Sequence, residues 1–81
     1  MKEQEIQALL SRITIKAGLF GGKPTIRGLR FPVGDILEML ASGMKEGEIL
    51  EQHPILEKDD IPAALLYASL KINNTRIIHA A

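Results

Sequence analysis

The spacing of apolar residues changes at Pro32, and this change limits the folds open to the chain. Before it, the segment RITIK at 12–16 alternates isoleucine with polar residues, which is typical of a strand with one buried face. After it, apolar residues return every three or four positions, as they do along one side of a helix. The sequence therefore predicts a short β-structure that leads into a set of helices.

Periodicity also predicts an amphipathic helix near the N-terminus, over residues 3–11, and three helices after Pro32. The first of the three ends at Gly43, because glycine freely adopts the left-handed backbone angles that stop a helix. The second covers about 45–52 and ends before Pro54, since the residue that precedes a proline disfavours helical angles.

The last predicted helix begins after Asp59. Pro62 lacks a backbone N–H and so belongs in the first turn, and with Asp59 as N-cap it takes the third helical position. Asp60 would then complement the positive end of the helix dipole. The face that we expect this helix to bury consists of Ile61, Ala64, Leu65, Ala68 and Ile72.

The length of 81 residues predicts a single small domain, which usually needs extra support from a crosslink, a metal or a partner chain. The chain has no cysteine, so disulfides and thiolate metal sites are excluded, and we expect a homodimer. The expected parts are an N-terminal helix over 1–11, a β-arm over 12–32, a three-helix core over 33–72 and a tail over 73–81.

No segment approaches the roughly 18 uninterrupted apolar residues of a membrane span. The start, MKEQEIQALL, lacks the basic-then-apolar order of a signal peptide. We therefore expect a cytoplasmic protein with no membrane partner.

The segment GLFGGKPTIRG at 18–28 holds four of the seven glycines and raises the question of a phosphate-binding loop. A P-loop requires GxxxxGK followed by Ser or Thr. Aligning Lys23 with the motif's lysine places Ala17 at the first glycine and Pro24 at the hydroxyl, and Pro24 also removes a backbone donor. The segment predicts a turn with its paired glycines at positive φ, and no nucleotide site.

Other patterns of catalytic residues are weak as well. The serines at 11, 42 and 69 have no histidine at a suggestive spacing, and His53 and His79 are too far apart for a local metal pair. His53 is best explained by packing between helices. We therefore expect no enzyme activity, no catalytic residue, no metal or cofactor and no small-molecule substrate.

The net charge of zero conceals a division between the two halves of the chain. Residues 11–34 carry five basic residues and no acid, whereas residues 35–70 carry eight acids and two lysines. This asymmetry indicates different partners for the two halves. The alternative is that the halves attract one another within a dimer.

Two stretches, GGKPTIRGLRFPVGDILEMLASGM and EILEQHPILEKDDIPAALLYAS, resemble the bacterial and archaeal family known as domain of unknown function 433, over about residues 13–70. The resemblance implies a mostly α fold: a homeodomain-like, helix-turn-helix type bundle with a β-arm that takes part in dimerisation. Some members look like antitoxins whose partner is a PIN-like ribonuclease. The matching positions are Gly22, Lys23, Pro24, Ile26, Arg27, Gly28, Arg30, Pro32 and Val33 in the arm, and Pro54, Leu56, Asp60, Ile61, Ala64, Leu65, Tyr67 and Ala68 in the helices.

The chain departs from the family pattern at a few positions. Leu29 replaces a usual threonine, and Lys16 with Ala17 replaces a common Asp-Pro. Lys45 and Glu57 stand where a serine or threonine cap is frequent. Loss of such a cap should weaken each helix start by about 1 kcal/mol unless another group replaces it.

The first functional hypothesis is a DNA-binding antitoxin that regulates its own operon. In a helix-turn-helix protein the last helix should display basic or amide side chains to DNA, but residues 59–71 offer two aspartates and one lysine. We therefore expect the arm to bind DNA through Lys23, Arg27 and Arg30, with Thr25 also exposed. The alternative for these cations is a solvated charge or a salt bridge between subunits.

The second hypothesis is a protein-interaction module with no role in nucleic-acid binding. It would dimerise through the arm residues Ile13, Ile15, Ile26 and Phe31. It would mask a PIN-like partner with its helices or with the tail, where Lys71 and Arg76 are the candidate contacts for a carboxylate-rich active site. Alternatively, the tail is a helix end or a strand packed on the partner subunit.

Overall fold

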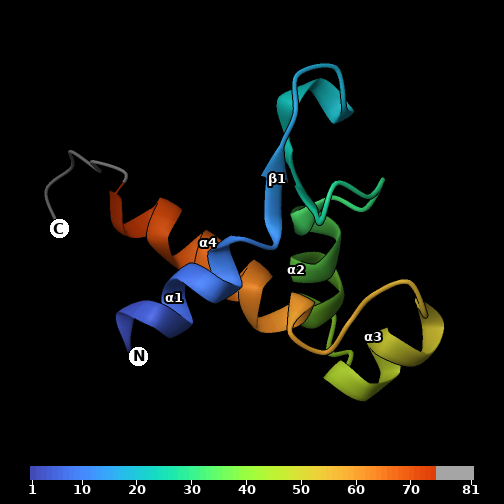
Figure 1. The fold of residues 1–81 in the computed structure, drawn as a ribbon. Helices are drawn as coiled ribbons and strands as arrows, with labels where there is room; N and C mark the ends of the chain where they lie inside the picture. The colour runs from blue at the N-terminus through green and yellow to red at the C-terminus, as the bar shows by residue number, and fades with distance from the viewer. Residues whose placement is uncertain (75–81) are drawn as a thin grey trace, which may run out of the picture.

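The structure, a computed structural model, describes residues 1–74 and contains four helices and one two-stranded hairpin (Figure 1). The elements are α1 (Glu3–Leu10), β1 (Ile13–Ile15), the 3₁₀ turn η1 (Phe20–Gly22), β2 (Pro24–Ile26), α2 (Val33–Ala41), α3 (Glu46–Gln52) and α4 (Asp60–Asn74). The predicted mostly helical fold, with an N-terminal helix and a β-hairpin before the main helices, is confirmed. None of the helices in residues 1–74 has both the length and the apolar character that crossing a membrane requires.

The hairpin forms an arm that rises from the helices, with η1 at its far end (Figure 1). Its strands are antiparallel, and Thr14 lies opposite Thr25. Gly21 and Gly22 have φ values of 63° and 81°, as the sequence predicts for a turn. Phe20 also has a positive φ, 49°, which the sequence does not predict because bulky side chains rarely adopt it.

The core is built where β2, α2, α3 and the start of α4 meet. Fully or almost fully buried aliphatic side chains form one cluster: Ile26, Val33, Ile36, Ile49, Leu56, Ile61 and Ala64. Because β2 contributes a central member of this cluster, the base of the arm is part of the core and its tip is not.

The predicted buried face of α4 is partly wrong. Leu65 and Ile72 are 48% and 65% exposed, whereas Ala63 is completely buried. Helix α4 contacts α1, α2 and β1 through the side that carries Ala63 and Ala64. None of the elements in residues 1–74 covers the next side of the helix, and Leu65 and Ile72 lie there seven residues apart, about two turns.

At two helix starts, where Lys45 and Glu57 replace a serine or threonine cap, another group takes over the role of the cap. Gly43 has a φ of 98°, and the N–H of Met44 donates to the Met39 carbonyl at 3.1 Å, so the predicted glycine stop of α2 is confirmed. At the start of α3, the N–H of Lys45 donates to the Glu48 carboxylate at 2.9 Å. Before α4, the N–H of Glu57 donates to Oδ2 of Asp60 at 2.7 Å. At each of these two helix starts a carboxylate thus accepts a backbone N–H and holds the entry of the chain into the helix.

Candidate functional site

The base of the arm is fixed to the helices by a buried carboxylate, that of Asp60 at the first residue of α4. Arg12, just before β1, places Nη1 2.9 Å from Oδ1 of Asp60. Arg27, just after β2, places Nη2 3.0 Å from Oδ2 and Nε 3.1 Å from Oδ1. Because the two arginines flank the hairpin, one carboxylate binds both ends of the arm.

Neighbouring groups complete this ionic cluster. Nη2 of Arg27 also donates to the Ile55 carbonyl at 2.8 Å, and Nη1 of Arg12 donates to the exposed carboxylate of Glu57 at 2.9 Å. Within residues 1–74, every buried side-chain nitrogen and oxygen has a hydrogen-bond partner. The cluster is therefore a satisfied network in which charge-assisted bonds offset the cost of burial.

The protonation of Asp60 follows from two opposing effects. Burial alone would raise the pKa of its carboxyl group, because removal from water disfavours the charged form. Hydrogen bonds from Arg27, from the N–H of Glu57 and from Arg12 outweigh burial and hold the pKa of Asp60 below its ordinary value. The carboxylate is ionised at neutral pH and carries the charge that both arginines require.

This geometry corrects two predictions about the arm. Arg27 does not display its charge to a ligand, because its guanidinium faces Asp60 of the same chain and its side chain is only 28% exposed. Thr25 is not exposed but completely buried, and its hydroxyl donates to the Thr14 carbonyl at 3.3 Å. The DNA-contact assignment of Arg27 and the exposure of Thr25 are therefore wrong.

Three other cations remain at the surface of the arm and the loop that follows it: Lys16, Lys23 and Arg30. We call them the arm cations. Within residues 1–74 none of them forms an ion pair. Lys16 and Arg30 line one shallow hollow with Gly18 and Gly28, and no acid contributes to it. Lys16 was not among the predicted contacts, although it lies in the same acid-free segment.

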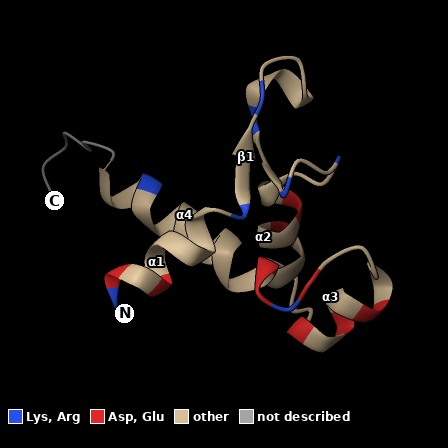
Figure 2. Cartoon of the chain, in the orientation of Figure 1, with Lys and Arg blue, Asp and Glu red and all other residues tan. Residues whose placement is uncertain are grey.

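Acidic residues gather elsewhere. Figure 2 shows basic residues along the arm and acidic residues on α2, on α3 and at the start of α4. Helix α3 contributes Glu46, Glu48 and Glu51, which are all exposed. The charge division seen in the sequence is therefore only partly a division in space, because Arg12 and Arg27 pair with Asp60, and Lys23 and Arg30 each line a hollow together with Asp35 and Glu38 of α2.

The residues predicted to form a dimer contact have mixed positions. Ile26 is completely buried in the core of its own chain, so its assignment to a dimer surface is wrong. Ile13 and Phe31 also pack against that core, and the Phe31 ring meets His53 edge-on with centroids 5.1 Å apart. His53 thus packs against another side chain, as predicted, but its partner Phe31 lies in the segment before α2 and not in a helix. Ile15 is 59% exposed and is the predicted dimer residue that the arm displays.

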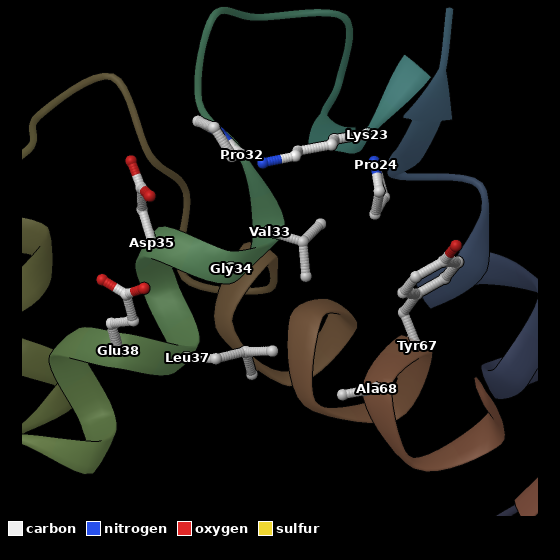
Figure 3. Close-up of a pocket in the computed structure, with 10 residues that line it drawn as sticks. All are labelled: Lys23, Pro24, Pro32, Val33, Gly34, Asp35, Leu37, Glu38, Tyr67 and Ala68. Carbon is white, nitrogen blue, oxygen red and sulfur yellow. The ribbon is translucent and has the colours of Figure 1, made fainter. Parts of the chain in front are cut away.

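An apolar pocket of about 340 Å³ lies between the start of β2, the first half of α2 and α4 (Figure 3). Val33 and Leu37 of α2 and Tyr67 and Ala68 of α4 form most of its wall. Its rim is charged: Lys23 extends over it from the arm side, and Asp35 and Glu38 stand on the α2 side (Figure 3). The pocket is suited to an apolar side chain with a cation beside it.

The end of α4 and the tail were predicted to contact a partner through Lys71 and Arg76. The Lys71 ammonium lies 5.7 Å from the centroid of the Tyr67 ring, a cation–π geometry. Arg76, the other predicted tail contact, lies outside the described residues. In residues 1–74 no three histidine, aspartate or glutamate side chains gather in a way that could hold a metal ion.

Comparison with known proteins identifies the chain's relatives. The model of the family described as "Protein of unknown function (DUF433)" matches residues 13–68. This chain belongs to the DUF433 family. It is similar to a solved DUF433 protein from Anabaena variabilis, with 30% sequence identity, a TM-score of 0.73, and coverage of 86% of this chain and 69% of that one.

A second relative of this DUF433 chain is the uncharacterized protein y4eO of Sinorhizobium fredii, which is 33% identical over 64 residues. The match covers 79% of this chain but 29% of the relative. The chain thus spans less than a third of that protein's length.

Proposed function

We propose that this DUF433 chain is the antitoxin of a toxin–antitoxin pair, binding a PIN-like ribonuclease with its helices and DNA with its arm. The observation that carries the proposal is that the arm cations form no ion pair in residues 1–74, while most of the acids lie on the helices, with Asp35 and Glu38 beside Lys23 and Arg30. A protein that binds a ribonuclease and a nucleic acid at the same time needs two separate surfaces. The site of action would be the cytoplasm.

The DNA surface consists of the arm cations, Lys16, Lys23 and Arg30. Each chain contributes three, so two chains carry six before any of them is used in a contact between the copies, and six is the lower limit of the roughly six to ten phosphate contacts that make binding strongly salt-dependent. Glycines at 18 and 28, with open space where a Cβ would lie, let a phosphate approach the backbone beside Lys16 and Arg30.

The partner surface that we propose is the uncovered side of α4. Leu65 and Ile72 are both about half or more exposed and lie on the same side of the helix. Exposed apolar residues at this spacing are typical of a helix that docks against another protein. This observation also supports the second candidate, a protein-interaction module that binds the ribonuclease and never binds DNA.

Salt-dependent DNA binding tests the first candidate. Fluorescence anisotropy with a duplex from the chain's own promoter should give an affinity that falls steeply between about 50 and 200 mM salt. Lys23→Ala and Arg30→Ala should each weaken binding and lower the salt slope by about one for every phosphate that the variant no longer neutralises. Lys45→Ala, an exposed cation of the helical body, is the matched control. Failure to bind DNA at low salt would leave only the interaction module.

Inhibition of RNA cleavage tests the partner surface. A PIN-like ribonuclease encoded beside this chain should lose activity when the chain is added, and Leu65→Glu or Ile72→Glu should restore cleavage. Ile55→Glu is the control, because Ile55 is 55% exposed but lies outside α4. Full cleavage in the presence of the unaltered chain would contradict the antitoxin assignment.

A further inference from the structure

Phe20 is an exposed aromatic residue on a strained backbone at the tip of the arm. In residues 1–74, the non-glycine residues with positive φ are Phe20 and Arg27. The bonds to Asp60 account for the conformation of Arg27. Phe20 makes no such bond, its ring is in no aromatic pair among these residues, and it is 41% exposed. A bulky side chain kept in an unfavourable conformation points to a contact outside the monomer.

The apolar pocket between the start of β2, α2 and α4 is the surface that fits this ring. Its wall of Val33, Leu37 and Ala68 is apolar, and the Tyr67 ring offers an aromatic edge or face to a second ring. Its volume of about 340 Å³ leaves room for a phenyl group. The pocket of a chain does not hold that chain's own Phe20, which is not among its lining residues although Lys23, three positions further along the chain, is.

Charge complementarity favours a second copy of the chain as the source of the ring. The arm that carries Phe20 has Lys16 and Lys23 on either side of it and no acid. The α2 rim of the pocket has Asp35 and Glu38, and within residues 1–74 neither forms an ion pair. An incoming arm would therefore bring its lysines to a rim that has two carboxylates and one cation of its own chain, Lys23, and the lysines engaged in this way are not available to DNA.

We propose that Phe20 of one copy inserts into the apolar pocket of a second copy, and that the second copy does the same in return. The exchange is a two-fold contact, in which the same two surface features meet twice. It deepens the homodimer of the proposed function and requires neither DNA nor the ribonuclease. Two rings bury about 300–500 Å² together, less than the roughly 1,200 Å² of a stable interface, so the exposed Ile15 on the same arm must add to it.

Disulfide trapping tests the proposed contact directly, because the chain contains no cysteine of its own. Phe20→Cys and Ala68→Cys are made as separate proteins, mixed, and oxidised mildly with oxidised glutathione. Mass spectrometry should show a mixed dimer of the two variants. Phe20→Cys mixed with Ser42→Cys is the control, since Ser42 is exposed at the C-terminal end of α2, outside the pocket. Equal yields from both mixtures would overturn the proposal.

Sedimentation equilibrium measures the contribution of the ring. Phe20→Ala and Phe20→Gly should each raise the dimer dissociation constant by roughly a thousandfold, because each dimer loses two aromatic anchors of about thirtyfold each, whereas Ile55→Ala should leave it unchanged. The glycine variant accommodates the positive φ without strain, so its loss of association cannot come from a distorted arm. Association of Phe20→Gly at the strength of the parent would overturn the inference and leave the pocket to a different molecule.

The outcomes also separate this inference from the proposed function. A parent chain that is monomeric but binds DNA with a steep salt dependence would contradict the arm exchange alone. A chain that dimerises through Phe20 but binds neither DNA nor a ribonuclease would contradict the proposed function and support the exchange.

Discussion

The guanidinium of Arg27 lies along the carboxylate of Asp60, with Nη2 3.0 Å from Oδ2 and Nε 3.1 Å from Oδ1. The two residues are 33 positions apart in the chain. Their pairing joins the end of β2 to the start of α4, and Arg12 joins the beginning of β1 to the same carboxylate. The orientation of the arm relative to the helices therefore depends on this carboxylate together with the packing of Ile26 in the core.

Asp60→Asn should lower the free energy of unfolding by about 3 kcal/mol. The neutral amide would leave Arg12 and Arg27, whose side chains are only 25% and 28% exposed, without their counterion. Urea denaturation followed by circular dichroism measures the loss. Asp59→Asn is the matched control: Asp59 is 63% exposed and its contact with Arg12 is 3.9 Å long, so the expected change is about 0.5 kcal/mol or less. Equal losses in the two variants would contradict the role assigned to Asp60.

The stability of the chain should fall in acid because of Asp60. Its pKa is lower in the folded state than the ordinary value of about 3.9, so the ionised carboxylate favours the folded chain. This contribution is fully present above the unfolded-state pKa and is lost as the pH falls through the folded-state pKa. Urea denaturation at a series of pH values between about 3 and 7 should show the parent and Asp60→Asn converging below about pH 4. A constant difference over the whole range would contradict the depressed pKa.

Arg27 and Arg30 should differ in what their removal does. Arg27→Ala breaks the bonds to Asp60 and to the Ile55 carbonyl, and should cost about 2–3 kcal/mol of stability. Arg30→Ala removes an exposed side chain without an ion pair in the described part of the chain, and should change stability by less than about 0.5 kcal/mol. Thermal and urea denaturation of the two variants check this. A large loss for Arg30→Ala would assign that residue to the fold and weaken its assignment to DNA.

At position 20, glycine should be more stable than alanine. The φ of Phe20 is 49°, a region that costs an L-residue about 1–2 kcal/mol and glycine almost nothing. Phe20→Gly should therefore exceed Phe20→Ala in melting temperature by several degrees, measured at a concentration at which both are monomeric. At Ala17, which does not have a positive φ, the order should reverse, with Ala17→Gly about 0.5–1 kcal/mol less stable than the parent. The same order at both positions would contradict the backbone conformation of Phe20.

Glu48 should stabilise the start of α3 through its side chain. Glu48→Ala removes the acceptor for the Lys45 N–H and should cost about 1 kcal/mol, because lysine has no acceptor with which to cap the helix itself. Glu48→Gln keeps an acceptor oxygen and should lose less. Glu46→Ala, at the first residue of the same helix, serves as the control, and denaturation in urea measures all three. A loss for Glu46→Ala as large as that for Glu48→Ala would indicate charge at the helix start as the cause.

Local signals in the sequence were sufficient for most of the helices. Pro62 and Gly43 fix a start and a stop by sterics alone, and the structure places α4 and α2 accordingly. The face of α4 was predicted less well, because the position of its buried side depends on where α1, α2 and β1 lie. Leu65 has the chemistry of a core residue and is excluded from the core only by that arrangement.

The candidate site was harder to predict because its pairs are distant in the chain. Asp60 follows another aspartate at a helix start, and capping is an adequate explanation until Arg12 and Arg27 are brought to it from 48 and 33 residues away. Phe20 was missed for a different reason. No propensity assigns a phenylalanine to left-handed angles, so the conformation is visible only in the coordinates.

Both ends of the hairpin are attached to one buried carboxylate, that of Asp60. The segment between the two ends can therefore change in sequence and length without disturbing the helices. Residues 16–23 could be lengthened, shortened or replaced while the helices keep their anchors. Any natural or engineered substitution at position 60, by contrast, would have to be matched at positions 12 and 27. Binding preferences of such proteins can thus change quickly at the tip of the arm. At its base, Arg12, Arg27 and Asp60 can change only together.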